Sequence, residues 1–351
     1  MSGWRAAAYA GAQFPLPLPL PVVKVCAVSK REENLGSGRG SGSGLRASAF
    51  GFADNPEIID AIDHTETMYF FLNGRLVPEQ DARVPVSDRA FLYGDAAFDT
   101  LCAYGGRLFR AQEHLQRLML SLAALRIEPP GTLAQMEAHL YAVLERNAVH
   151  DAILRTTVSR GSGARGLSIR EVGVPTYLIA CYPGSEMNAA QTSVKLEQVG
   201  VRRTPAESLP AHAKTANYLN SILALAEAMD AGADEALLLD LRGCIAECAY
   251  SNVFFVRGAR LLTPGLDAGI LPGITRATVL ELARAGGIAI SETSLEAAVA
   301  QEADEAFITN SVRGVVPVHA IGERRFPAPG AVTSQIAQSY WTLVQRETGS
   351  R

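Results

Sequence analysis

Strand and helix signals alternate along most of this chain, and this alternation restricts its fold more than any other feature. Asn73-Gly74 and Gly105-Gly106 each lie between short apolar runs, so both pairs predict the turn of a β-hairpin. Apolar residues then recur three or four positions apart, which predicts helices over residues 111–127 and 133–147. Hairpins mixed with helices are not the pattern of a doubly wound Rossmann sheet. We therefore predict an α+β, or mixed α/β, fold.

The second half of the chain repeats this mixture. Short apolar runs predict strands, and helices are predicted over residues 217–232, 271–287 and 332–347. Between the halves, residues 184–191 are small and polar, as is typical of a linker. We predict a boundary there, with a smaller N-terminal domain at 68–187 and a larger C-terminal domain at 188–351.

The first 67 residues have a different composition. Phe14–Val23 alternates proline with leucine, which favours an extended segment, and Gly36–Gly44 consists of glycine, serine and one arginine. We interpret residues 1–67 as a low-complexity extension that is disordered or cleaved. Two alternatives stay open. The segment could be an organelle-targeting peptide, because no acid precedes Glu32, or it could result from a wrongly assigned start.

Composition excludes several classes of function. The 351 residues are 48% hydrophobic and 19% charged, which suits a globular protein with a sizeable core. The net charge is −4 and no basic stripe is interleaved with aromatic residues, so we expect no nucleic-acid partner. No apolar stretch is long enough for a membrane span. The five cysteines lack metal-site spacing, so we expect no metal and a reducing, cytoplasmic location.

Lys214 is an isolated amine just ahead of a predicted helix. The usual fate of a lysine is a solvated surface, but three other features suggest a common ligand. The segment 271–276, LPGITR, starts a helix whose free N–H groups could bind a phosphate. Glu247 is the only acid in an apolar segment and needs a cation, and Arg117 lies on an apolar helix face. An aldehyde, a ring nitrogen and a phosphate would satisfy all four features, and pyridoxal 5′-phosphate (PLP) carries these groups.

Residues 68–350 resemble the class IV aminotransferases, the fold-type IV PLP enzymes. The family includes branched-chain aminotransferases, D-amino-acid aminotransferases and aminodeoxychorismate lyases. The resemblance implies a two-domain fold with a smaller N-terminal α/β sandwich and a larger C-terminal pseudo-barrel. It also implies a homodimer in which a loop of the partner closes the site. The matching segments, in order, are SDRAFLYGDAAFDT, EHLQRL, SRGSGARG, AKTANYL, DEALLLD, IAECAYSNVFFV, LPGITR and FITNSVRGVVPV.

The resemblance also implies roles for single residues. Lys214 would form the internal aldimine with PLP and then move the proton of the substrate Cα. Tyr218 would bond the ring oxygen next to the imine, and Glu247 would pair with the pyridine nitrogen. The residues implied to hold the phosphate are Arg117, Ile274, Thr275 and Ser311. The residues implied to contact the substrate are Tyr93, Phe98 and Arg165.

The substrate is the open question at this stage. Arg165 in SRGSGARG matches an arginine that lies near the substrate carboxylate in D-amino-acid aminotransferases and in the lyases. Those aminotransferases have a histidine two residues later, where this chain has Leu167. The segment KTANYL, which contains Tyr218, resembles the matching segment of aminotransferases. We therefore expect transfer from a small α-amino acid to a 2-oxo acid, with D-amino acids favoured over branched-chain L-amino acids.

Two alternative functions stay open. The first is 4-amino-4-deoxychorismate lyase, and the second is a PLP-binding protein without catalysis. Arg165 could also be an ordinary solvated arginine in a glycine-rich loop.

Overall fold

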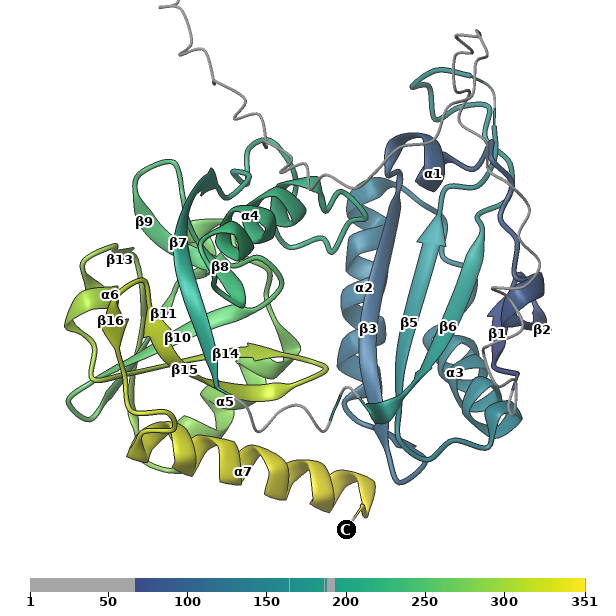
Figure 1. Ribbon diagram of the computed structural model, residues 1–351. Coiled ribbons are helices and arrows are strands. Elements are labelled where there is room, and N and C mark those ends of the chain that lie inside the picture. The colour runs from purple at the N-terminus through teal and green to yellow at the C-terminus, as the bar shows by residue number, and fades with distance from the viewer. Residues whose placement is uncertain (1–66, 164, 186, 188–192, 351) are drawn as a thin grey trace, which may run out of the picture. The chain divides into compact units, whose positions relative to one another are not determined.

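The computed structural model describes residues 67–163, 165–185, 187 and 193–350, which belong to one structural unit (Figure 1). The segment predicted to be a low-complexity extension therefore lies, apart from Thr67, outside the described residues.

The first sheet contains six antiparallel strands in the order β2-β1-β6-β5-β3-β4. Its first hairpin turns at Asn73 and Gly74, whose φ angles are 49° and 88°. Two successive positive φ angles define a type I′ turn, which matches the twist of paired strands and confirms the predicted hairpin. The strands are β1 (Tyr69–Leu72), β2 (Arg75–Pro78), β3 (Ala96–Tyr104), β4 (Arg107–Leu108), β5 (Ala152–Ser159) and β6 (Tyr177–Pro183).

Two long helices cover one face of this sheet (Figure 1). They are α2 (Ala111–Leu125) and α3 (Leu133–Asn147), and the short α1 (Arg89–Tyr93) precedes β3. Thr132 and Gln135 form a reciprocal capping box that fixes the start of α3. Leucines three and four residues apart on α2 are fully buried against the strands, as the periodicity predicts.

The second sheet is mixed, with the order β12-β11-β10-β14-β15-β7-β8-β9-β13, and β16 pairs with β15. The pairs β11–β12, β15–β7 and β7–β8 are parallel. The strands are β7 (Val194–Arg202), β8 (Glu235–Leu239), β9 (Cys244–Cys248), β10 (Asn252–Arg257), β11 (Arg260–Pro264), β12 (Ala289–Thr293), β13 (Leu295–Glu296), β14 (Glu305–Asn310), β15 (Gly314–Ile321) and β16 (Arg324–Arg325).

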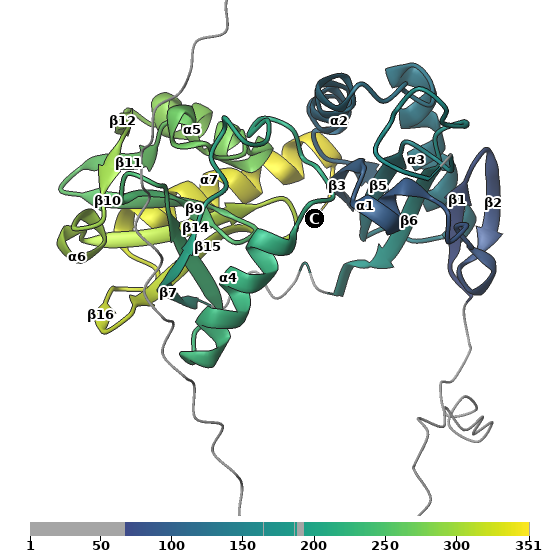
Figure 2. The same ribbon diagram turned by 90° about the horizontal axis from the view of Figure 1, so that it is seen from above.

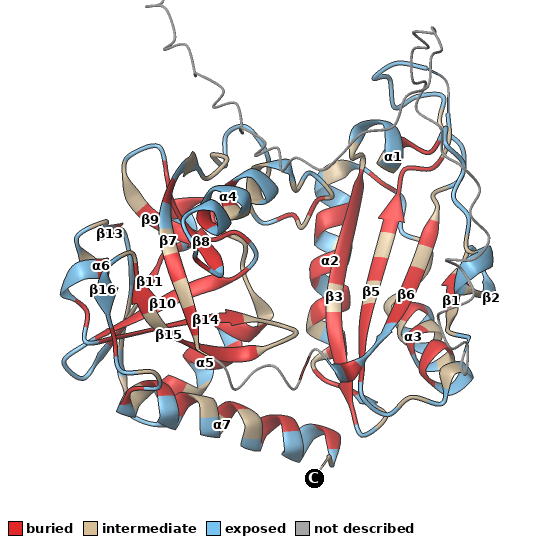
Figure 3. Ribbon diagram, viewed as in Figure 1, coloured by how far each residue is buried: buried red, intermediate tan, exposed pale blue. Residues whose placement is uncertain are grey.

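Four helices accompany this sheet: α4 (Leu219–Asp230), α5 (Ile274–Ala285), α6 (Val299–Glu302) and α7 (Ala331–Thr348). Helix α4 packs against β7 and β8 (Figure 1), and it lies beside β7 when seen from above as well (Figure 2). Burial is concentrated in the strands, whereas the outer face of α4 is exposed (Figure 3). The predicted mixed α/β fold is confirmed.

One hydrophobic core is shared between the two sheets. Cys102 and Tyr104 of β3 belong to the same buried cluster as Phe254 of β10 and Tyr340 of α7. The rings of Phe109 and Tyr340 meet edge to face, with centroids 5.8 Å apart. Because α7 contacts β3 as well as β14 and β15, the predicted domains share buried surface. The boundary at residues 187/188 stays a prediction.

Candidate active site

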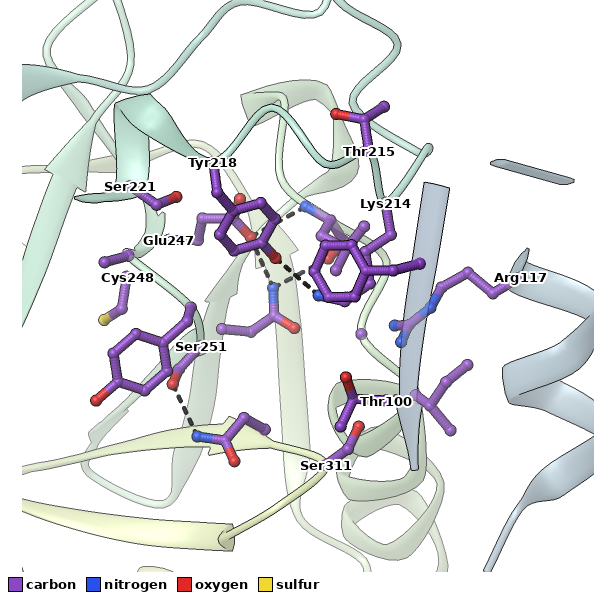
Figure 4. A pocket seen from close by; sticks show the side chains of 18 of the residues that line it. Thr100, Arg117, Lys214, Thr215, Tyr218, Ser221, Glu247, Cys248, Ser251 and Ser311 are labelled. Carbon is purple, nitrogen blue, oxygen red and sulfur yellow. Dashed lines mark hydrogen bonds between the residues drawn. The ribbon is translucent and has the colours of Figure 1, made fainter. Parts of the chain in front are cut away.

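A cavity of about 460 Å³ lies where β3, α2 and β5 face the segment before α4, the β9–β10 hairpin and the start of α5 (Figure 4). Both sheets contribute walls to it. Of the ten residues predicted to form the site, eight line this cavity. They are Phe98, Arg117, Lys214, Tyr218, Glu247, Ile274, Thr275 and Ser311.

The backbone holds Lys214 against the first sheet. Its amide donates to Ser121 Oγ at 2.9 Å, and its carbonyl accepts from the amide of Phe98 at 3.0 Å. The side chain is free to enter the cavity, where Nζ donates to the hydroxyl of Tyr218 at 2.8 Å. Nζ also lies 4.7 Å from the ring centroid of Phe98. The amine is therefore tethered and partly enclosed by aromatic rings.

Glu247, on β9, is buried and forms an ion pair. Its Oε1 lies 2.7 Å from Arg203 Nε, while Oε2 accepts from Asn252 Nδ2 at 3.1 Å and from the amide of Leu271 at 3.0 Å. Burial raises the pKa of Glu247, and Arg203 opposes that rise. A cation that entered the cavity beside this carboxylate would stabilise the ionised form further.

Arg117 is held by a second buried carboxylate, Asp99. Arg117 Nε and one terminal nitrogen each lie 2.8 Å from an oxygen of Asp99, and His114 Nδ1 lies 2.8 Å from the same group. Burial alone would raise the pKa of Asp99, but Arg117 and His114 hold it well below its usual value. The guanidinium is thus fixed at the cavity wall with its charge maintained.

The N-terminus of α5 lies beside Arg117, whose other terminal nitrogen donates to the carbonyl of Pro272 at 3.2 Å. Gly273 is the N-cap and provides no side chain to bond the first amides. A Cβ at Gly273 would overlap Asn252 Oδ1, so the chain can approach the wall here only because this residue is glycine. Free amides, the helix dipole and a fixed guanidinium together suit a dianionic phosphate.

Tyr93 and Arg165 are not among the residues that line the cavity in this chain. Tyr93 ends α1, and its hydroxyl accepts from the amide of Gly166 at 3.3 Å. Arg165 is exposed in the neighbouring loop. Their assignment to the substrate rests on the resemblance and stays a prediction.

Three arginines of the cavity, Arg155, Arg203 and Arg313, were not predicted from the sequence. Arg203 pairs with Glu247, as described above. Arg155 projects from β5 and stacks on Phe98, with its guanidinium carbon 3.5 Å from the ring centroid. Burial lowers the pKa of Arg155. The signal for Arg155 was present, because it is the single charge in the strand sequence AILRTTV.

The chain matches the family model of class IV amino-transferases over residues 96–321. It therefore belongs to that family, whose members are PLP-dependent enzymes, and its fold is fold type IV. Both agree with the resemblance found in the sequence.

Within this family, the chain is similar to proteins named branched-chain aminotransferases. A Methanocaldococcus jannaschii protein, provisionally named a branched-chain-amino-acid aminotransferase, is 39% identical over 257 residues, which cover 73% of this chain and 89% of the relative. The branched-chain aminotransferase of Thermoproteus uzoniensis, solved with norvaline, has a TM-score of 0.76 at 31% identity and covers 80% of this chain and 96% of its own. The branched-chain amino acid aminotransferase of Thermobaculum terrenum, solved in its PLP form, has a TM-score of 0.75 at 27% identity and covers 81% and 97%.

Within the described part of the chain, no helix combines the length and the apolar character that a membrane span needs. The same residues include no group of three or more histidine, cysteine or acidic residues that could hold a metal ion.

Proposed function

We propose that this cavity binds PLP and that the enzyme transfers the amino group of a branched-chain L-amino acid to a 2-oxo acid. The observation that carries the proposal is the meeting of Lys214, Glu247 and Arg117 in one cavity, since these residues are far apart in the sequence. The names of the relatives and solved neighbours support the choice of substrate.

The residues present fit the cofactor. Arg117 and the N-terminus of α5 would hold the phosphate, with Thr275 and Ser311 beside them. Glu247 would hold a proton on the ring nitrogen, because its buried carboxylate lines the same cavity and would pair with that cation. When bound, PLP supplies a carbonyl carbon that reacts with amines and a ring that accepts electrons from the substrate Cα.

Lys214 has the geometry of a proton-transfer base. Its Nζ is tethered by Tyr218 at 2.8 Å and lies 4.7 Å from the ring centroid of Phe98, so the amine is held at a fixed place in the cavity. With the substrate bound, Nζ would be the base that takes the proton from the substrate Cα and holds it for return. The hydroxyl of Tyr218 orients Nζ during this transfer.

Arg155 is the candidate anchor for a carboxylate of the substrate. Within the described residues it forms no ion pair, although it lines the cavity and stacks on Phe98. A guanidinium binds a carboxylate through two parallel hydrogen bonds, and the stacking restricts its orientation. Apolar residues that could contact a branched side chain also line the cavity: Leu209, Pro210, Ala211, Ala249, Leu271 and Val312.

The test is a half-reaction panel on the purified holoenzyme. L-leucine, D-alanine, L-glutamate, (R)-1-phenylethylamine and 4-amino-4-deoxychorismate are mixed in turn with the enzyme while the cofactor absorbance is followed. We expect L-leucine to convert the cofactor fastest. A faster reaction with D-alanine would favour the D-amino-acid preference inferred from Arg165, and release of an aromatic product from aminodeoxychorismate would favour the lyase.

We also propose that the enzyme acts as a homodimer. Phe91 and Leu92 of α1 are exposed, as are Leu219, Ile222 and Leu223 on α4. Large apolar side chains clustered on the surface usually mark an interface, and a second copy of the chain would cover them. Light scattering at micromolar concentration distinguishes the dimer from a monomer.

The state of the cysteines supports a cytoplasmic location, which we propose for the enzyme. Cys102, Cys181, Cys244 and Cys248 are all free thiols, as is usual in a reducing compartment.

A further inference from the structure

A buried carboxylate lies behind the cavity wall and has no part in the proposed chemistry. Glu235 begins β8 and is fully buried. Its Oε1 accepts a hydrogen bond from the amide of Tyr250 at 3.0 Å, and Oε2 accepts one from Ser251 Oγ at 3.0 Å. Tyr250 and Ser251 themselves line the cavity, so Glu235 contacts its wall from behind.

Ser251 extends this contact to a loop after β14. Its Oγ accepts from Asn310 Nδ2 at 3.1 Å, a bond drawn in Figure 4. Asn310 Oδ1 in turn accepts from the amides of Val312 at 3.1 Å and Arg313 at 2.8 Å. A continuous series of hydrogen bonds thus runs from Glu235 to the backbone of residues 310–313, here called the 310–313 loop. All four residues of this loop line the cavity.

The direction of these hydrogen bonds fits an ionised Glu235. A serine hydroxyl has one hydrogen, which Ser251 gives to the carboxylate, and its lone pairs remain for Asn310. A protonated Glu235 would offer its own hydrogen to Ser251, and one of the two hydroxyl hydrogens would lose its acceptor. The positive charge of Arg313, in the loop, also attracts the ionised form.

We propose that ionised Glu235 is a positioning residue that holds the 310–313 loop against the cavity through Ser251 and Asn310, and that protonation of Glu235 loosens this loop. This proposal deepens the proposed function. Only the expected change in KM rests on that function, whereas the loosening of the loop does not. The loop contains Ser311, which is predicted to contact the phosphate, so its position matters for both cofactor and substrate.

The relevant pH range follows from the surroundings of Glu235. Burial raises the pKa of Glu235 to about 7, against the opposing effects of Tyr250, Ser251 and Arg313. Glu247 raises this pKa further, and ionised Glu235 raises the pKa of Cys248 and of Tyr250. At a pH above about 7, Glu235 is therefore ionised and holds the loop in place. At a lower pH, Glu235 is protonated and the loop is loosened.

The test is hydrogen–deuterium exchange of the peptide spanning residues 306–316 in the full-length holoenzyme. In the wild type we expect the protection of the Val312 and Arg313 amides to fall about tenfold between about pH 8 and about pH 6, after correction for intrinsic exchange. In Glu235→Gln it should be low at both pH values. Wild-type protection that does not change with pH would overturn the proposal, and so would full protection in Glu235→Gln.

Glu305 provides a matched control. It is another buried carboxylate, on β14, but it accepts from the amide and hydroxyl of Thr333 at the start of α7 and does not line the cavity. Glu305→Gln should behave as the wild type. A variant that loosened the 310–313 loop equally would show that any buried carboxylate has this effect, which contradicts a specific role for Glu235.

Two further measurements cover the case in which Glu235→Gln does not fold. Ser251→Ala removes the connecting hydroxyl and leaves Glu235 unchanged, so it must lose protection at about pH 8. The KM for L-leucine should rise about tenfold in both variants while kcat changes little. Exchange needs no substrate, so lost protection without any turnover of L-leucine would refute the substrate assignment and leave this inference intact.

Discussion

Lys214 is positioned by its main chain, so its amine can be removed without disturbing the backbone. The contacts to Ser121 and Phe98 use only the amide and the carbonyl of Lys214. We expect Lys214→Ala to fold as the wild type and to lose at least about a thousandfold in turnover, because both the nucleophile and the base are removed. Circular dichroism and single-turnover kinetics measure the two effects. Lys195→Ala, outside the cavity, should keep its activity, and a Lys214 variant with more than a thousandth of the rate would refute the assignment.

Arg155 and Arg165 are alternative anchors for the substrate carboxylate, and substitution of each residue distinguishes between them. A charge-assisted bidentate pair contributes roughly 1.5–3 kcal/mol, so loss of the true anchor should raise KM about ten- to a hundredfold. We expect this effect on L-leucine from Arg155→Ala, and less than about threefold from Arg165→Ala. An amine without a carboxylate is the control, since neither variant should change its KM. The reverse order of effects would support Arg165 and the D-amino-acid preference.

Ionisation of Glu235 should hold the 310–313 loop in place but lower the free energy of unfolding. Its pKa is raised from 4.5 to about 7 on folding, so its contribution to stability is complete below about pH 4.5 and is lost as the pH rises through about 7. The loss is on the order of 3 kcal/mol, from about 1.4 kcal/mol per pKa unit. Urea unfolding should show this fall in the wild type and not in Glu235→Gln. Identical pH profiles for the two proteins would contradict the raised pKa.

Among the helices and strands, those whose limits depend on neighbouring residues in the chain could be predicted from the sequence. The helix predicted over 133–147 has these limits in the structure, because the capping box of Thr132 and Gln135 specifies its start. The helix predicted in the segment 271–287, with Pro272 ahead of it, begins at Ile274, and its N-cap Gly273 is extended. The ion pair of Arg203 with Glu247 could not be predicted, because it joins segments that only the sheet topology brings together.

Substitution of Gly273 tests whether the N-terminus of α5 contributes to cofactor binding. A Cβ there would displace Asn252, which donates to Glu247, so both the phosphate end and the ring-nitrogen end of the site should suffer. We expect Gly273→Ala to weaken PLP binding at least about tenfold and to cost about 1–3 kcal/mol of stability through overpacking. Spectral titration of the apoenzyme measures the first effect. Gly286→Ala, at the other end of α5, is the control, and equal weakening by both variants would contradict a local role.

At the scale of the whole molecule, the N-terminal extension can be tested by removal. Its composition gives no periodic apolar face that could pack against the enzyme. A chain that starts at Met68 should therefore fold, dimerise and retain wild-type kcat and PLP affinity, as measured by light scattering and steady-state kinetics. Insolubility or loss of PLP in this shorter chain would show that residues 1–67 are structural.

The core shared by the two sheets has a consequence for the lifetime of the loaded enzyme. Phe109, Phe254 and Tyr340 belong to one buried cluster, and the cavity takes its walls from the same two sheets. Neither sheet can unfold alone without exposing this core, so partial opening is nearly as costly as global unfolding. Local opening that would release a bound cofactor is thus suppressed, and a bound cofactor in turn stabilises the folded state. Cofactor retention and stability against unfolding therefore depend on the same packing between the two sheets.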